Sequence, residues 1–134
     1  MSVNDSILDD HFDLMPLEVV KDILQDDVIG YIANFQQEYD TNELLECLNA
    51  FSEKTTVDYL TMLLDVSVYF KEDANKHGER HWQKDSSVSC YINSAVGHYL
   101  KWLRGDIDER HDHAFVWSIM CCIWEVDYHD CATY

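Results

Sequence analysis

Acidic side chains at helical spacing are the first feature of this sequence that suggests chemistry. Asp58, Asp65 and Glu72 recur every seven residues, which places them along one stripe of a helix. Glu109 and Asp112 lie three residues apart and share a face of a later helix. Carboxylates that converge inside a helical bundle are common ligands of Mg²⁺ or Mn²⁺. A solvated acidic stripe, with acids favoured at helix starts by the helix dipole, gives the same pattern.

The stretch "KHGERHWQKD" at 76–85 is the second feature. It gathers basic and imidazole side chains around Trp82, in a chain with 26 acidic residues and nine basic ones: Lys76, His77, Arg80, His81 and Lys84. After a helix that ends at Gly78, these cations can bind phosphate oxygens. Trp82 would then stack on a base, or else fill a gap in the bundle.

The pair His111–Asp112 gives a third pattern, because it follows His98 and precedes Asp127. This is the order of the metal ligands in HD phosphohydrolases. The interval of 13 residues between His98 and His111 is short for that fold, so this remains a minor alternative. The sequence has no Ser-His-Asp order, phosphate-binding glycine loop or Cys-x-x-Cys motif.

The net charge of −17 is unevenly distributed along the chain. Residues 71–110 hold seven acids and seven bases, so the whole surplus of 19 acids over two bases lies outside them. This balance disfavours binding to duplex nucleic acid, which needs a basic face. A small phosphorylated ligand bound within 71–110 remains compatible with it, as do charges that simply alternate on solvated faces. The acidic residues 1–70 offer a face to a basic protein partner.

Helical periodicity predicts the elements that position these residues. We expect a short helix from Pro16, further helical segments within 27–37 and 41–51, and longer helices over about 57–76, 87–104 and 108–127. Thr55 or Thr56 would cap the 57–76 helix, and Asp106 with Glu109 would form the box that opens the last one. Between Ala114 and Trp124 the only polar side chain is Ser118, which indicates a helix buried on all sides. The sequence therefore predicts one all-α domain over 1–134, a helical bundle around a central C-terminal helix.

The cellular setting is predicted from what the sequence lacks. No run approaches the ~18 apolar residues of a membrane span, and the acidic first residues do not resemble a secretory signal. The five cysteines lack the spacing of a zinc site, and two are adjacent in an apolar run. We expect a reduced, cytoplasmic protein without membrane contact. The 13% aromatic content of a helical bundle also favours a homodimer.

Several segments together resemble a family of small phage and bacterial proteins, the dATP/dGTP diphosphohydrolase N-terminal family. They are "HFDLMPLEVV", "KHGERHWQKD", "HYLKWLRGDIDERHDHAFVW" and "IMCCIW". The resemblance covers residues 10–25 and 63–125, and 26–60 is a divergent or inserted helical segment. It implies an all-α, MazG-like enzyme in which Mg²⁺ (or Mn²⁺) held by helical carboxylates helps to split a purine nucleoside triphosphate into monophosphate and pyrophosphate.

The resemblance also implies roles for individual residues. Glu79, Arg80, His81 and Trp82 occupy the family's substrate loop, and His98, Asp108, Glu109, His111 and Trp117 match its later motifs. The implied metal ligands are Asp65, Glu72, Glu109 and Asp112, and the implied phosphate-binding cations are Arg80, Lys84, Lys101 and Arg104. His98 and Glu109 would be catalytic, with His98 positioning water or phosphate.

Three positions depart from the family pattern. His81 replaces an asparagine, Gly97 replaces an arginine before His98, and Ser118 replaces an asparagine after Trp117. Each is a position where a polar contact to the ligand is expected, and loss of an arginine removes a strong phosphate contact. The alternative is therefore a nucleotide-binding protein that sequesters rather than hydrolyses, or an acidic inhibitor of phage type on the same scaffold.

Overall fold

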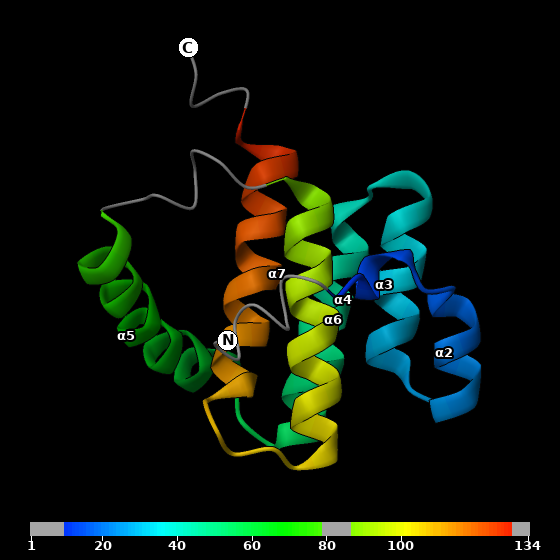
Figure 1. Ribbon diagram of the computed structural model, residues 1–134, viewed down its shortest axis with the longest axis horizontal. Helices are drawn as coiled ribbons and strands as arrows, with labels where there is room; N and C mark the ends of the chain where they lie inside the picture. The colour runs from blue at the N-terminus through cyan, green and yellow to red at the C-terminus, as the bar shows by residue number, and fades with distance from the viewer. Residues whose placement is uncertain (1–9, 79–86, 130–134) are drawn as a thin grey trace.

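The computed structural model describes residues 10–78 and 87–129, without the side chain of His77. These residues form one 3₁₀ turn and six α-helices and contain no strand, which confirms the predicted all-α single-domain bundle (Figure 1). The elements in chain order are η1 (Phe12–Leu14), α2 (Leu17–Leu24), α3 (Asp27–Glu38), α4 (Thr41–Thr55), α5 (Tyr59–His77), α6 (Val88–Arg104) and α7 (His111–Asp127).

The C-terminal helix α7 is the centre of the bundle, as predicted. It packs along α6 and also contacts α4 and α5, while α2, α3 and α4 follow one another on the far side (Figure 1). Its one polar residue within the apolar run, Ser118, is fully buried. The Ser118 hydroxyl donates to the carbonyl of Ala114 at 2.8 Å and lies 2.8 Å from the Ser94 hydroxyl of α6. The buried hydroxyl is therefore satisfied, which removes the main cost of placing it there.

Side-chain caps explain where most helices begin. Asp26, Asp40, Asp58 and Ser87 each accept a hydrogen bond from a backbone N–H in the first turn of the helix that follows. The cap of α5 is therefore Asp58 and not Thr55 or Thr56. The last helix begins at His111 without a side-chain cap, later than predicted. The expected box of Asp106 and Glu109 does not form, because Asp106 binds Arg104 and Glu109 faces two histidines.

A buried carboxylate joins three of the helices. Asp26, only 5% exposed, accepts from the backbone N–H of Ile29 at 3.1 Å and from the Tyr99 hydroxyl of α6 at 2.6 Å. Lys54 of α4 lies 3.4 Å from the same carboxylate. A buried charge is tolerated only when it is paired and hydrogen-bonded, so this network fixes α3, α4 and α6 relative to one another.

We expect Tyr99→Phe to lower the free energy of unfolding by about 2 kcal/mol, because it removes a hydrogen bond to a buried charged group. Urea unfolding followed by circular dichroism measures the change. The control is Tyr39→Phe, whose ring is 51% exposed, and it should shift the midpoint little. Equal destabilisation by the two variants would contradict a special role for the Tyr99 hydroxyl.

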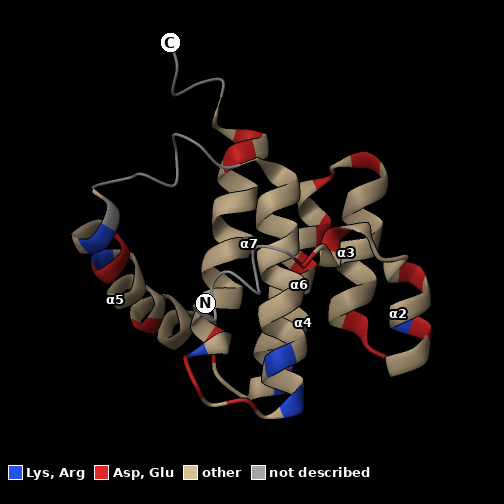
Figure 2. Cartoon of the chain, in the orientation of Figure 1, with Lys and Arg blue, Asp and Glu red and all other residues tan. Residues whose placement is uncertain are grey.

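Charge is distributed unevenly over the fold, as the sequence suggested. Figure 2 shows acidic positions spread over the outer helices, with basic positions at the far end of α5 and at the C-terminal end of α6. None of the described helices is both long enough and apolar enough to cross a membrane.

Candidate metal centre

A tight connection brings the chemical groups together at one end of the bundle. Helix α6 ends at Arg104, and Gly105, with a φ of +90°, reverses the chain into the connection before α7. Glycine adopts this left-handed conformation without strain. His98 precedes Gly105 by seven residues and His111 follows it by six, so the turn sets the two imidazoles opposite each other.

His98, Glu109 and His111 form a compact group, called here the histidine cluster. The two Nδ1 atoms are 2.9 Å apart. The Oε1 atom of Glu109 is 3.4 Å from Nδ1 of His98 and 3.8 Å from Nδ1 of His111. The three groups can each offer one ligand atom within 4.8 Å of the others. On the other side of the imidazole, Nε2 of His111 lies 2.7 Å from Oδ1 of Asp108.

The hydrogen bonds restrict the tautomers of the two imidazoles. With Nε2–H of His111 donating to Asp108, Nδ1 of His111 accepts from Nδ1–H of His98, so His98 must carry its proton on Nε2 when its Nδ1 binds an ion. Burial, with smaller contributions from His111 and Lys101, lowers the pKa of His98 to about 4. His98 is therefore neutral at pH 7, which is the form of imidazole that binds metal ions. The hydrogen bond from His111 keeps the pKa of Asp108 below its usual value.

The cluster has the atom separations of a cation site, and the carboxylate of Asp108 contacts one of its imidazoles as it would in such a site. When two ligand atoms each lie about 2.1 Å from the same ion and their bonds to it are at right angles, the two atoms are about 3 Å apart. This distance is close to the separations in the cluster. A metal-bound histidine usually donates its other N–H to a carboxylate, as His111 does to Asp108. Because imidazole prefers transition metals, this set of two nitrogens and one carboxylate suits Mn²⁺ better than Mg²⁺.

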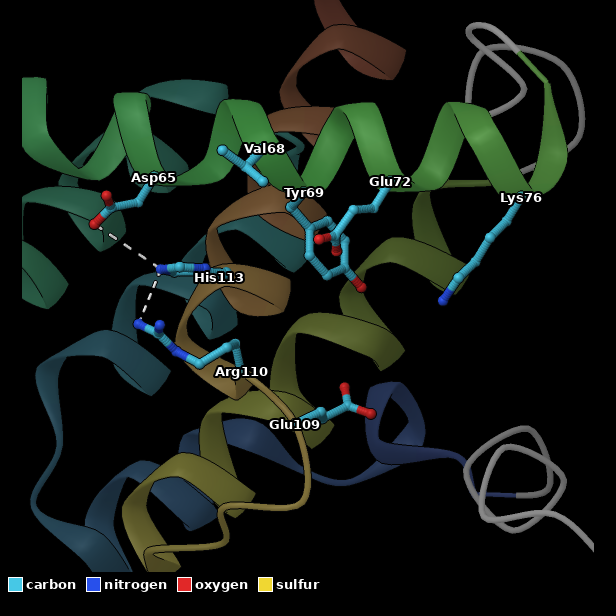
Figure 3. Close-up of a pocket in the computed structure, with 8 residues that line it drawn as sticks. All are labelled: Asp65, Val68, Tyr69, Glu72, Lys76, Glu109, Arg110 and His113. Atoms are coloured by element: carbon cyan, nitrogen blue, oxygen red, sulfur yellow. Dashed lines mark hydrogen bonds and ion pairs between the residues drawn. The ribbon is translucent and has the colours of Figure 1, made fainter.

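A polar pocket of about 490 Å³ adjoins the cluster, between α5 and the start of α7 (Figure 3). Glu109 belongs to both the cluster and the pocket wall. The wall consists of Asp65, Val68, Tyr69, Glu72 and Lys76 from α5 together with Glu109, Arg110 and His113. Burial, with smaller contributions from the charges of Glu109, Asp73 and Glu72, raises the pKa of Tyr69 to about 12. The three carboxylates close to this tyrosine favour a cation in the pocket.

The structure places the four predicted metal ligands in different surroundings. Glu109 joins the histidine cluster, whereas Asp65 and Glu72 lie along the pocket wall on α5 (Figure 3). Asp65 is 3.9 Å from His113. Asp112 turns to Arg110, whose guanidinium donates to both carboxylate oxygens at 3.1 and 2.9 Å. Burial raises the pKa of Asp112, but the hydrogen bonds from Arg110 and from the backbone of His113, together with the charges of these two residues, lower it by more.

The predicted substrate-binding residues are distributed over three regions. Glu79, Arg80, His81, Trp82 and Lys84 lie outside the described residues. Lys101 is close enough to His98 to lower its pKa, while Arg104 is bound in bidentate fashion to Asp106. Trp117 is partly buried where α7 meets α5 and α6, in ring contact with Tyr69, Phe70 and Tyr91. Its Nε1 atom is buried without a hydrogen-bond partner in the described part of the chain.

The HD alternative is not assembled in this fold. His98 and His111 meet, but Asp112 binds Arg110. Asp127 is at the other end of α7, about 24 Å along the axis from His111 at 1.5 Å per residue. There it accepts a hydrogen bond from the Thr41 hydroxyl at 2.8 Å.

Packing explains the departure at Gly97. A Cβ atom at this position would lie 2.8 and 2.9 Å from two atoms of the Phe12 ring, which lies against the helix there. Element η1 is held to α6 by Asn93, whose side chain accepts from the backbone N–H of Phe12 at 2.6 Å. A side chain at Gly97 would have to displace Phe12. Apolar packing by Phe12 therefore occupies the position at which the resemblance implies an arginine.

The low pKa of His98 predicts a pH dependence of stability in the metal-free protein. The unfolded chain binds a proton near pH 6.5 and the folded His98 only near pH 4, so stability falls as the pH decreases between these values. Between pH 7.5 and pH 5, His98 alone lowers the free energy of unfolding by about 2 kcal/mol. Urea unfolding in EDTA at the two pH values measures it. His98→Gln should lose less stability over this interval, and an identical loss in the variant would contradict the prediction.

Comparisons with known proteins add no assignment: no family model, no curated protein and no solved structure matches this chain. The resemblance in the sequence is therefore a hypothesis that depends on the residues quoted for it.

Proposed function

We propose that this protein is a divalent-metal-dependent hydrolase that splits a purine nucleoside triphosphate into the monophosphate and pyrophosphate. The supporting observation is that Glu109 belongs at once to the histidine cluster and to the wall of a polar pocket. An ion bound by the cluster would therefore lie at the edge of a cavity of suitable size for a small ligand. The same wall carries Lys76 and Arg110, two cations that suit phosphate oxygens.

The ion would be held by His98, Glu109 and His111, with Asp108 fixing the orientation of His111. When bound, a divalent ion neutralises phosphate charge and makes a bound water more acidic. Lys76, at the far end of α5, and Arg110, at the start of α7, face the pocket from different helices (Figure 3). They can therefore bind different phosphates of one chain and hold the scissile bond beside Glu109.

The reaction is a balanced hydrolysis. Water adds its oxygen to the α-phosphorus, the bond from that phosphorus to the bridging oxygen breaks, and the leaving pyrophosphate carries that oxygen away. The proton of the attacking water is released to a base. The protein has no covalent step to perform, so its contributions are positioning and charge.

A nucleotide-sequestering protein is the second candidate, and the packing at Gly97 favours it. Phe12 packs where the resemblance implies a phosphate-binding arginine, so the chain lacks one cation that the resemblance would provide for the charge of the transition state. Such a protein would hold a triphosphate in the same pocket without turning it over.

A nucleotide panel separates the two candidates. The purified protein is incubated with dATP, dGTP, ATP, GTP, dCTP and dTTP in the presence of Mg²⁺, Mn²⁺ or EDTA. Products are separated by ion-exchange chromatography, and binding is measured by calorimetry. Metal-dependent release of pyrophosphate with the monophosphate supports the hydrolase, most strongly with Mn²⁺ and a purine. Tight binding with intact nucleotide recovered supports sequestration, and neither binding nor turnover rejects both.

A further inference from the structure

Helix α5 carries an apolar face that nothing in the described structure covers. Leu60, Leu64 and Val68 are 75%, 70% and 55% exposed. They recur every four residues and form one stripe. The opposite face of the same helix packs on the bundle through Met62 and Val66, which are 6% and 1% exposed. Successive residues are rotated by about 100° around the helix axis. Leu64 is therefore about 180° around the axis from the mean direction of Met62 and Val66. The stripe is thus the outermost line of the helix.

The apolar surface continues beyond the stripe on one side. A shallow groove of about 490 Å³ lies between α4, α5 and α7, and its walls are almost entirely apolar. Within it, Leu45, Tyr59, Leu63 and Tyr128 are between 43% and 56% exposed. Between Tyr59 and Phe70, α5 carries apolar side chains on its outer side as well as on the side that packs on the bundle. Apolar helix surface is normally covered, and α5 lies at the edge of the bundle (Figure 1). The stripe and groove together are called here the α5 face.

The apolar area of the α5 face is about that of one side of a specific protein interface. With about 200 Å² for a fully exposed aromatic side chain and about 100 Å² for an aliphatic one, its residues expose on the order of 500 Å² of apolar side chain. Specific protein interfaces bury about 800 Å² on each partner, including a polar rim. Monomeric proteins rarely expose a contiguous apolar patch larger than a few hundred Å².

The stripe is symmetric about its central residue, so it can pair with a copy of itself. Leu60 and Val68 are each four residues from Leu64. When two copies of α5 pair antiparallel at Leu64, each Leu60 meets the other copy's Val68 and the two Leu64 side chains meet on the twofold axis. This is an isologous contact, in which one patch complements itself. Ridges of residues four apart also pack into the grooves of an identical helix.

Charge permits the same pairing. Between Tyr59 and Phe70 the only charged residue is Asp65, which lies in the wall of the polar pocket and not on the stripe. Along the stripe itself, two acidic chains can therefore meet without opposing like charges. Glu46 and Glu53 of α4 are near Tyr59, at the groove side of the face. At the ends of the stripe, antiparallel pairing would bring Lys71 of each copy near the Asp58 end of the other.

We propose that the α5 face binds a second copy of this chain, with the two α5 helices antiparallel and centred on Leu64. The inference does not depend on the proposed reaction. It has a consequence for the pocket, because α5 also supplies the wall residues from Asp65 to Lys76. Pairing would hold that wall against α7, so the pocket is expected to be best ordered in the dimer.

Sedimentation equilibrium on the wild-type protein and two variants tests the pairing. We expect a wild-type dimer at 50 µM, and a dissociation constant at least 100-fold higher for Leu64→Lys, which places a charge on the axis. The matched control is Ile23→Lys on α2, since Ile23 is 73% exposed and lies away from the face. It should leave the dimer unchanged. A monomeric wild type at 200 µM, or equal weakening by both variants, would overturn the proposal.

Disulfide trapping tests the orientation in a Cys90→Ser, Cys131→Ser background. Leu64→Cys should oxidise to a covalent dimer. Leu60→Cys and Val68→Cys should each crosslink poorly alone but efficiently when mixed, because antiparallel pairing brings position 60 to position 68 of the other copy. Efficient crosslinking of Leu60→Cys to itself would contradict this orientation.

Salt dependence tests the source of the attraction. The dimer should strengthen severalfold from 20 mM to 300 mM NaCl, because salt screens the repulsion between two chains of charge −17 and leaves the apolar contact intact. An attraction that weakens severalfold with salt would contradict an apolar contact between like-charged copies.

Discussion

Glu109→Gln should lower kcat/KM for purine triphosphate hydrolysis by about 10²–10³-fold, because it removes the charged ligand that holds the ion beside the substrate. The carboxylate lies 3.4 Å from one imidazole and 3.8 Å from the other, and it also forms part of the pocket wall. Glutamine preserves the shape of the side chain but is a weaker ligand for a hard cation. The measurement is initial-rate kinetics at saturating Mn²⁺, with pyrophosphate as the detected product.

Glu125→Gln is the matched control for this variant. Glu125 belongs to the same helix, but it lies near the other end of α7, 3.2 Å from His129. It should retain wild-type kinetics. A Glu109→Gln variant with normal turnover would show that the chemistry takes place elsewhere, and circular dichroism would establish that both variants are folded.

His111→Asn should weaken Mn²⁺ binding by at least 100-fold, since it removes a nitrogen ligand that is fully buried and already oriented. Asparagine also breaks the contact with Asp108, which is 2.7 Å from Nε2 of the imidazole. Mn²⁺ affinity can be measured by the loss of the free-ion electron paramagnetic resonance signal during titration. The matched control is His129→Asn at the end of α7, which should not change the affinity.

Asp108→Asn distinguishes the ligand from the residue that positions it. An outer carboxylate of this kind changes metal affinity by about 10–100-fold when it is lost, less than removal of the ligand itself. Asp106, Asp108 and His111 form a second group among the described residues that could hold an ion. If Asp108→Asn weakened Mn²⁺ binding more than His111→Asn does, the ion would be bound by this second group.

The helices were predictable because their signals are local. Apolar spacing within 88–104 and the unbroken apolar run after Ala114 are properties of single segments, and they correspond to α6 and α7. Capping was less predictable, because several residues near a helix start compete for one role. Asp58 caps α5 because its carboxylate reaches the backbone N–H of Thr61 at 2.8 Å. Asp106 and Glu109 do not cap α7, because Asp106 binds Arg104 and Glu109 lies beside His98.

The histidine cluster was only partly predictable. His98, Asp108, Glu109 and His111 were all singled out from the sequence, but the predicted ligand set followed carboxylates along helical stripes. A stripe identifies residues on one face of one helix and does not show what faces them. The cluster instead forms across the turn at Gly105, where positions at similar distances from the glycine meet. Arg110 and His113 were missed because their positions beside the pocket depend on how α5 packs on α7.

The central claim is that His98, Glu109 and His111 hold one ion beside the polar pocket. Anomalous diffraction at the manganese edge tests this claim most directly. Crystals grown with Mn²⁺ and a non-hydrolysable dGTP analogue should show a peak about 2.1–2.3 Å from one atom of each of these three side chains. The phosphates of the analogue should extend toward Lys76 and Arg110. A fully occupied ion held instead among Asp65, Glu72 and Asp112, with the two imidazoles still in contact, would contradict the claim.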